Sequence, residues 1–124
     1  MTLPKFRVWD RLTNKMFPIG IIDYTLESVY IEEPNGLYAE RDFDDIELMQ
    51  STGKRDSLNN EIFDGDIIAV DNCGYLNYGR VFYSNETASY RVEFKDEVLE
   101  LSEVSCDYVC GNIFENPELW EEII

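Results

Sequence analysis

A chain of 124 residues is long enough to bury the core of one domain, and its 44% hydrophobic and 14% aromatic content excludes a disordered protein. It carries 26 Asp and Glu against 10 Lys and Arg, a formal net charge of −16, so its average surface repels nucleic acids and anionic membranes. The chain has no histidine, which excludes Ser-His and Cys-His nucleophile pairs. We therefore expect a protein partner, a basic one if electrostatics selects it, and no direct contact with nucleic acid or membrane.

The first half of the chain predicts short strands joined by turns. Alternating or apolar runs mark these strands at 5–9, 16–22, 28–31, 37–39 and 46–49. Pro18 in the second run indicates an edge position or a bulge, because proline has no amide hydrogen to give to a sheet. The Glu-Pro-Asn-Gly turn at 33–36 predicts that the third and fourth runs form a hairpin.

A polar, turn-rich stretch at 53–60 is the expected seam between two lobes. Further β-type runs follow at 62–70, 79–83, 89–95, 98–101 and 108–114. At the end of the chain, Asn116 is a good helix N-cap and Pro117 suits the first helical position, so the sequence predicts one short helix over 117–123.

The Asp64-Gly65-Asp66 motif leads into a buried strand and allows two interpretations. In the first, Gly65 takes a positive φ and the two aspartates bind amides of the same turn. In the second, the two carboxylates hold Mg²⁺ or Ca²⁺, although the motif lacks the further oxygen ligands of a calcium loop. We favour the structural turn and expect neither a metal nor a cofactor.

The cysteines, Cys73, Cys106 and Cys110, are odd in number and lack the Cys-x-x-Cys spacing of a metal site. This pattern is typical of reduced thiols rather than a disulfide framework. No apolar run approaches the roughly 20 residues that cross a bilayer, and the start of the chain lacks the apolar segment of a signal peptide. The sequence thus predicts a cytoplasmic protein.

Three blocks of the sequence, at 5–10, at 48–53 leading into 61–68, and at 111–119, occur in an order that points to one family. The second block opens with Leu-Met-Gln-Ser-Thr-Gly, and the third reads Gly-Asn-Ile-Phe-Glu-Asn-Pro-Glu-Leu. Together they resemble the YopX-like proteins encoded by phages and prophages of Gram-positive bacteria, over essentially the whole chain.

The resemblance implies a small SH3-type barrel in the C-terminal part, and it implies no biochemical activity. We therefore expect a mainly β chain in which an N-terminal β-hairpin lobe, 1–48, packs on an SH3-type barrel lobe, 49–124, that ends in the short helix.

Aromatic and acidic residues supply the candidate interaction sites. Trp9 alternates with the apolar side of its strand, so it either packs between the lobes or anchors a partner. The tyrosines are expected around the barrel loops, either as a ligand surface or as ordinary sheet residues. These tyrosines are Tyr75, Tyr78, Tyr83 and Tyr90. The carboxylates between 42 and 47 form either a cation or basic-partner site or a solvated face.

Three functional hypotheses follow. The first is a non-enzymatic phage or prophage accessory protein that binds another protein. The second is an acidic mimic of DNA that inhibits a host nucleic-acid-binding enzyme, since arrayed carboxylates can imitate phosphates. The third is a carboxylate- and metal-dependent enzyme, which the missing histidine makes the weakest of the three.

Overall fold

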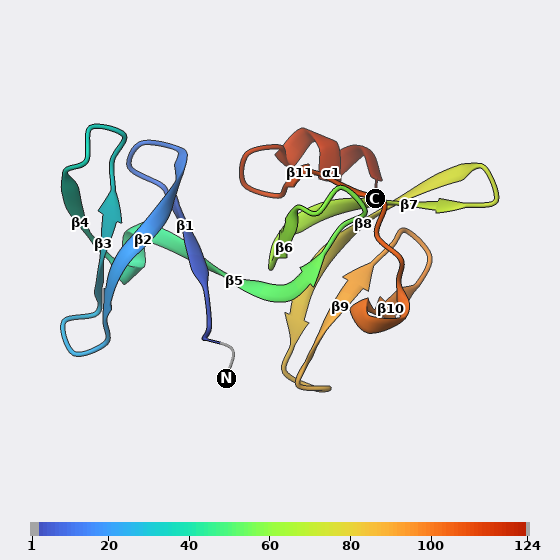
Figure 1. Cartoon of the computed structure of the whole chain (residues 1–124), viewed down its shortest axis with the longest axis horizontal. Helices are drawn as coiled ribbons and strands as arrows, with labels where there is room; N and C mark the ends of the chain where they lie inside the picture. The colour runs from blue at the N-terminus through green and yellow to red at the C-terminus, as the bar shows by residue number, and fades with distance from the viewer. Residues whose placement is uncertain (1–2, 124) are drawn as a thin grey trace. The chain divides into compact units, whose positions relative to one another are not determined.

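The computed structural model describes residues 3–123, and the fold is mainly β, as predicted (Figure 1). The first strands are β1 (Phe6–Asp10), β2 (Lys15–Asp23), β3 (Ser28–Glu32), β4 (Tyr38–Asp42) and β5 (Ile46–Arg55), with a 3-10 helix η1 (Phe43–Asp45) before β5. The remaining elements are β6 (Glu61–Phe63), β7 (Asp66–Asn72), β8 (Tyr75–Ser84), β9 (Ser89–Glu93), β10 (Val98–Glu100), the 3-10 helix η2 (Leu101–Glu103), β11 (Tyr108–Asn112) and the helix α1 (Pro117–Ile123).

The chain divides into two compact units, Met1–Gln50 and Ser51–Ile124. The division lies inside the continuous strand β5, close to the expected boundary after residue 48. The first part of β5 pairs with β1, and Ser51 beyond the division pairs with Phe63 of β6. The polar stretch 53–60 therefore lies within the second unit instead of forming the seam.

In the first unit, antiparallel strands follow the order β4-β3-β2-β1-β5 around a small apolar core. The buried core residues are Val8, Phe17, Val29, Ile31 and Ile46. The hairpin of β3 and β4 is confirmed. Because β2 lies between β1 and β3, the edge position predicted for Pro18 is wrong, and the bulge is confirmed by a register shift between Ile19 and Ile21.

The second unit is built on an antiparallel sheet with the order β10-β9-β8-β7-β11. Its core residues are Ile62, Ile68, Val81, Val92, Leu101, Val104 and Cys106. Among residues 51–123, β10 and β11 form the two opposite edges of this sheet and do not pair with each other, so no closed barrel is formed. One physical reason is that β10 has only three residues before the chain turns into η2.

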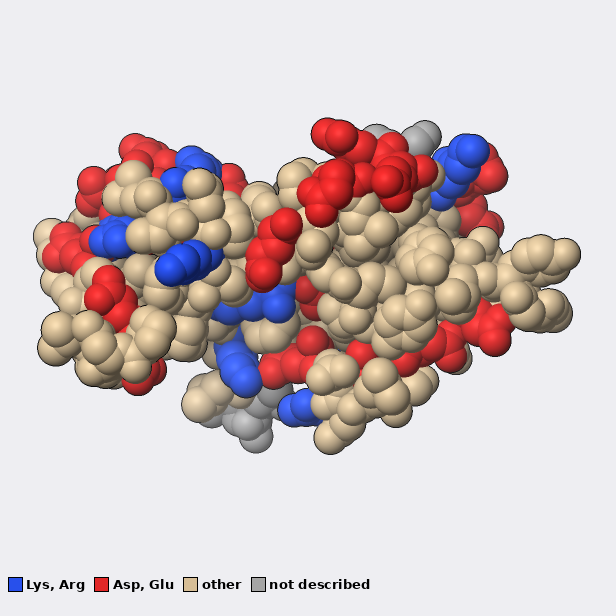
Figure 2. All heavy atoms as spheres, turned by 90° about the horizontal axis from the view of Figure 1, so that it is seen from above, with Lys and Arg blue, Asp and Glu red and all other residues tan. Residues whose placement is uncertain are grey.

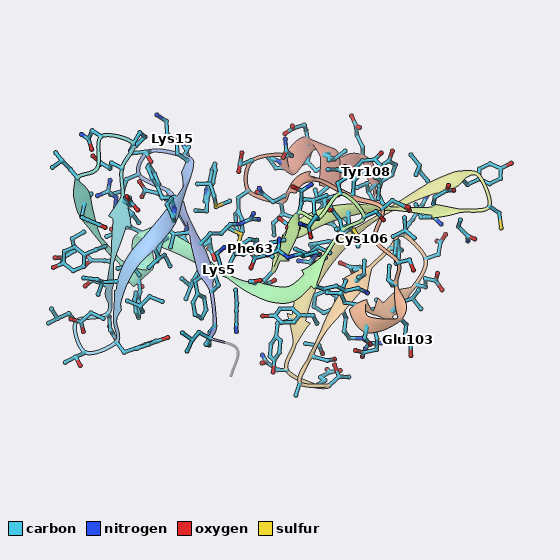
Figure 3. All side chains as sticks on the ribbon, viewed as in Figure 1. Lys5, Lys15, Phe63, Glu103, Cys106 and Tyr108 are labelled. Atoms are coloured by element: carbon cyan, nitrogen blue, oxygen red, sulfur yellow. The ribbon has the colours of Figure 1, made fainter. Side chains whose placement is uncertain are left out.

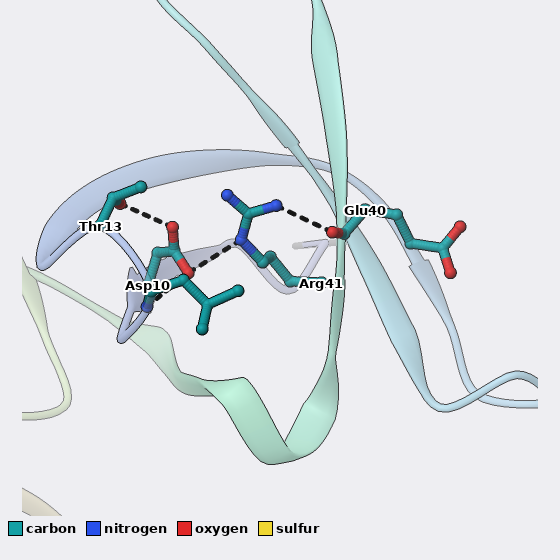
Figure 4. Close-up of polar contacts among 5 residues, drawn as sticks. Asp10, Thr13, Glu40 and Arg41 are labelled. Carbon is teal, nitrogen blue, oxygen red and sulfur yellow. Dashed lines mark hydrogen bonds and ion pairs between the residues drawn. The ribbon is translucent and has the colours of Figure 1, made fainter.

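An unexpected feature of the first unit is a fully buried aspartate, Asp10, at the end of β1 (Figure 4). Its carboxylate accepts bonds from the Thr13 hydroxyl at 2.6 Å and the Arg41 Nε at 3.0 Å, as well as from the Leu12 amide. Burial alone would raise the pKa of Asp10, but these hydrogen bonds and the charge of Arg41 outweigh it and lower the pKa. Asp10 thus joins the turn after β1 to strand β4.

Asp56 has the same role in the second unit. Its buried carboxylate accepts bonds from the amides of Leu58, Asn60 and Val109, and from the side chain of Asn60. Burial raises the pKa of this group, but the bonds from Asn60 and Val109 outweigh it and the pKa is lowered. The loop after β5 is therefore an ordered turn fastened to β11.

We expect Asp10→Asn to change the stability of the protein in a pH-dependent way. The folded pKa of Asp10 lies below the unfolded value of about 3.9, so its stabilisation is complete above that value and is lost as pH falls through the folded pKa. The difference in unfolding free energy between wild type and Asp10→Asn should be constant from about pH 5 to 7 and shrink below about pH 4. Urea titrations across this range measure it.

The pKa of Asp64 is raised, mainly by burial, so the effect of its ionisation on the free energy of unfolding has the opposite sign. Because Asp64 is present in both the wild type and Asp10→Asn, this effect cancels in the difference between them. A difference in unfolding free energy between wild type and Asp10→Asn that stays constant down to about pH 2.5 would contradict the lowered pKa of Asp10.

The described helices are short: α1 has seven residues. Within residues 3–123, no helix has the length and apolar character that a membrane span requires.

Candidate functional site

The second unit contains a groove with a volume of about 750 Å³. Its walls come from the β7–β8 hairpin, the turn between β9 and β10 together with β10, the end of η2 with the segment after it, and the helix α1. We call this surface the acidic groove. Its lining residues are Val70, Asp71, Asn72, Leu76, Asn77, Tyr78, Phe94, Lys95, Asp96, Glu97, Leu99, Glu103, Val104, Ser105, Leu119, Glu122 and Ile123.

Apolar side chains line much of the acidic groove. Val70, Phe94 and Leu99 pack against the buried core of the second unit while remaining partly exposed. Gly79 of β8 makes this packing possible, because a Cβ there would lie 2.5 Å from Val92 and 3.0 Å from the Phe94 ring. Leu76 remains 45% exposed. The groove thus presents apolar surface that the fold itself does not cover.

Charged side chains also line the groove, and most of them are acidic. The carboxylates are Asp71, Asp96, Glu97, Glu103 and Glu122. Among the described residues of the lining, Lys95 is the one cation, so these residues have a formal net charge of −4. Glu103 is exposed on η2 (Figure 3) and Glu122 is exposed on α1. Within residues 3–123, neither residue forms an ion pair.

The four candidate tyrosines do not form one surface. Tyr78 lines the acidic groove, and its hydroxyl is hydrogen-bonded to that of Tyr108, which raises the pKa of Tyr108. Tyr75 lies at the start of β8 and is 79% exposed. Tyr83 and Tyr90 pair edge to face, with ring centroids 5.3 Å apart, toward the other end of β8. Eight residues of strand separate Tyr75 from Tyr83, roughly 25 Å.

The other predicted interaction sites lie in the first unit. Trp9 is half-buried in β1, where it pairs with Met16 of β2 and Glu47 of β5. The acidic stretch around η1 is partly neutralised, because the Arg11 guanidinium binds the Glu47 carboxylate and the Asp44 carbonyl. The acidic face predicted at 42–47 is therefore partly engaged within the chain.

The Asp64-Gly65-Asp66 motif forms a structural turn between β6 and β7. Gly65 has a φ of +90°, as predicted, and its amide donates to the Val81 carbonyl at 2.8 Å. Asp66 is buried and accepts a bond from the Phe63 amide, while Asp64 accepts bonds from backbone amides. Both aspartates thus bind amides, and among the described residues no three candidate ligands converge on a metal site here.

The helix α1 begins at Pro117, over the predicted range. The side-chain oxygen of Asn116 accepts a hydrogen bond from the Asn112 amide. The backbone carbonyl of Asn116 accepts one from the Leu119 amide in the first helical turn. Exposed glutamates at 118, 121 and 122 gather around this helix (Figure 2), and its last turn contains no basic residue. The side of the second unit that carries α1 is therefore acidic.

All three cysteines are free thiols in very different environments. Cys106 is buried, and burial together with the charge of Asp56 raises its pKa to about 12. Cys73 is exposed in the β7–β8 turn. Burial also raises the pKa of the half-buried Cys110.

We expect maleimide at pH 8 to label Cys73 first and Cys106 only after unfolding. The thiolate fraction of Cys106 alone should slow its reaction about 10³-fold relative to an ordinary thiol. Mass spectrometry of digested samples over time measures this order. The Cys73→Ser variant is the control, since it should abolish the fast phase; rapid labelling of Cys106 in the native protein would contradict the structure.

Comparison with known proteins identifies a family and solved structures with a similar fold. The sequence matches the family described as YopX protein over residues 5–121. A search of curated proteins found no match. Among solved structures, the crystal structure of protein EF1440 from Enterococcus faecalis aligns with a TM-score of 0.67 and 27% sequence identity. The alignment covers 96% of this chain and 99% of that one, so the two folds agree over nearly their whole length.

Proposed function

Because the chain belongs to the YopX protein family, we propose that it is a cytoplasmic accessory protein of a phage or prophage, that it acts by binding another protein, and that it is not an enzyme. The observation that carries this proposal is the acidic groove, which offers uncovered apolar surface within a charged rim. Protein–protein interfaces also combine apolar and charged surface. The absence of histidine from the whole sequence further supports a binding function over acid–base catalysis.

We also propose that the second unit is an open variant of the SH3-type barrel. Five short antiparallel strands in one sheet, with the groove beside the β7–β8 hairpin and the β9–β10 turn, support this assignment. Small barrels of this type often bind peptides between their loops, although a fold analogy alone identifies no ligand.

The alternative hypothesis, mimicry of DNA, receives less support from the distribution of charge. A mimic requires a continuous array of carboxylates, whereas apolar side chains line the acidic groove together with its carboxylates. Three aspartates, at positions 10, 56 and 66, are buried and contribute nothing to a surface array.

Affinity capture from a lysate of a Gram-positive host tests the proposed function. The wild type should capture a defined protein, and Leu76→Asp, which places a charge on the groove surface, should lose it. Ile21→Asp is the matched control, because Ile21 is an exposed apolar residue of β2 in the first unit, and it should retain capture. Equal capture by wild type and Leu76→Asp would refute the groove as the binding site.

We expect no binding to duplex DNA, single-stranded DNA or RNA, even at low salt, where attraction to phosphate is strongest. The adjacent basic residues Lys54 and Arg55 donate to backbone carbonyls of their own unit, and Arg80 and Arg91 form ion pairs with Glu93 and Glu100. Fluorescence anisotropy at about 20 mM salt measures this. Saturable binding would overturn the proposal of a protein partner.

A further inference from the structure

We propose that the acidic groove accepts a cationic amphipathic segment of the partner protein, in which apolar side chains alternate with Lys or Arg. This inference rests on the proposed function and adds to it the chemistry of the partner. Two independent features of the groove carry it: the partly exposed apolar surface, and the excess of negative charge around that surface.

The apolar surface requires apolar anchors. Leu76 on β8, Leu99 on β10 and Ile123 on α1 all line the groove and remain at least partly exposed. Removing such surface from water is favourable by about 25 cal/mol per Å². A hydrophilic partner would leave this surface unused.

The rim selects the charge of the occupant. Asp96, Glu97 and Glu103 are exposed and form no ion pair among the described residues. A neutral apolar segment would remove water from these carboxylates without replacing its hydrogen bonds, which is costly. An acidic segment would add repulsion between like charges. Lys and Arg can lay their apolar stems on the groove surface and bring their charges to the rim carboxylates.

Lys95 leads to a prediction opposite in sign to the one for the acidic residues of the groove. It is the one basic residue among the described residues of the lining, and it lies beside Asp96 and Glu97 in the turn between β9 and β10. Within residues 3–123 it forms no ion pair. If the partner is cationic, Lys95 repels it, so Lys95→Glu should strengthen binding while acid-to-base changes on the same rim weaken it.

The test uses the full-length protein and three fluorescein-labelled synthetic peptides of equal length, built on a pattern that is amphipathic as an extended strand. The first peptide alternates Leu with Lys in an amphipathic pattern. The second replaces each Lys by Glu, and the third keeps Lys but replaces each Leu by Ser. We expect saturable binding of the first peptide, no binding of the second up to about 500 µM, and at least tenfold weaker binding of the third, about 1.4 kcal/mol.

Charge variants then locate the binding site. The double variant E103K/E122K should weaken binding of the Leu-Lys peptide at least about tenfold, and K95E should strengthen it about threefold. The matched control is E32K/E86K, which makes the same change in net charge at exposed positions outside the groove and should alter affinity less than about twofold. Circular dichroism confirms that each variant is folded.

Three results would overturn the inference: no binding of the Leu-Lys peptide, equal binding of its Leu-Glu counterpart, or equal weakening by E103K/E122K and by the control. The lysate experiment distinguishes these failures from a failure of the proposed function. If capture still depends on Leu76 while the Leu-Lys peptide does not bind, the groove binds a protein of different chemistry.

Discussion

Asp10→Ala should lower the free energy of unfolding by about 3 kcal/mol. The Asp10 carboxylate has no exposed surface and lies 3.0 Å from the Arg41 Nε, whose side chain is 16% exposed. Removing the carboxylate leaves the guanidinium charge largely buried without its partner, and the Thr13 hydroxyl and the Leu12 amide lose their acceptor. Urea denaturation of the two proteins measures the difference.

A second ion pair of the same unit provides the matched control. Arg11 and Glu47 are also paired, but their side chains are 47% and 41% exposed. Because exposed pairs contribute little, Glu47→Ala should cost at most about 1 kcal/mol. The double variant Asp10→Ala/Arg41→Ala should cost less than the sum of its single changes. Equal losses for Asp10→Ala and Glu47→Ala would show that the Asp10 pair is not buried in solution.

Local patterns in the sequence predicted the elements that depend on local chemistry. Alternation at Tyr90, Val92 and Phe94 marked β9, because side chains of a strand point alternately to its two faces. The Asn116-Pro117 pair marked the start of α1, because it suits the backbone geometry there. The turn at Gly65 was predicted for the same reason.

Features that join distant segments were not predictable in this way. Asp10 and Arg41 are 31 residues apart, and nothing in the spacing of either residue indicates the other. The Asp-x-x-Thr pattern of residues 10–13 was nevertheless a usable signal, since it is typical of a side-chain-bonded turn. The polar stretch 53–60 was interpreted as a seam because its composition resembles a linker, whereas its first residues belong to β5 and the buried carboxylate of Asp56 orders the turn that follows.

The acidic groove likewise could not be predicted from local patterns in the sequence. Its surface comes from four separate segments between 70 and 123, each of which contributes only a few side chains. The sequence did identify Tyr78 as a candidate, but it grouped this residue with Tyr83 on β8 and Tyr90 on β9, which pair with each other toward the other end of β8. Composition predicted an acidic surface, and only the fold shows which carboxylates surround apolar side chains.

Gly65→Val should destabilise the second unit by about 1–3 kcal/mol, because a β-branched residue resists the φ of +90° that this turn requires. The turn has little freedom to relax: the Gly65 amide donates to Val81, and its carbonyl accepts a bond from Ile113, at 2.8 and 3.0 Å. Gly36→Val is the control, since Gly36 has a φ of +84° in an exposed turn where a Cβ meets no atom within 4 Å. Its loss should be smaller, because an exposed turn can change conformation. Thermal unfolding measures both variants, and a Gly65→Val midpoint no lower than that of Gly36→Val would show that the buried turn does not hold β7 in place.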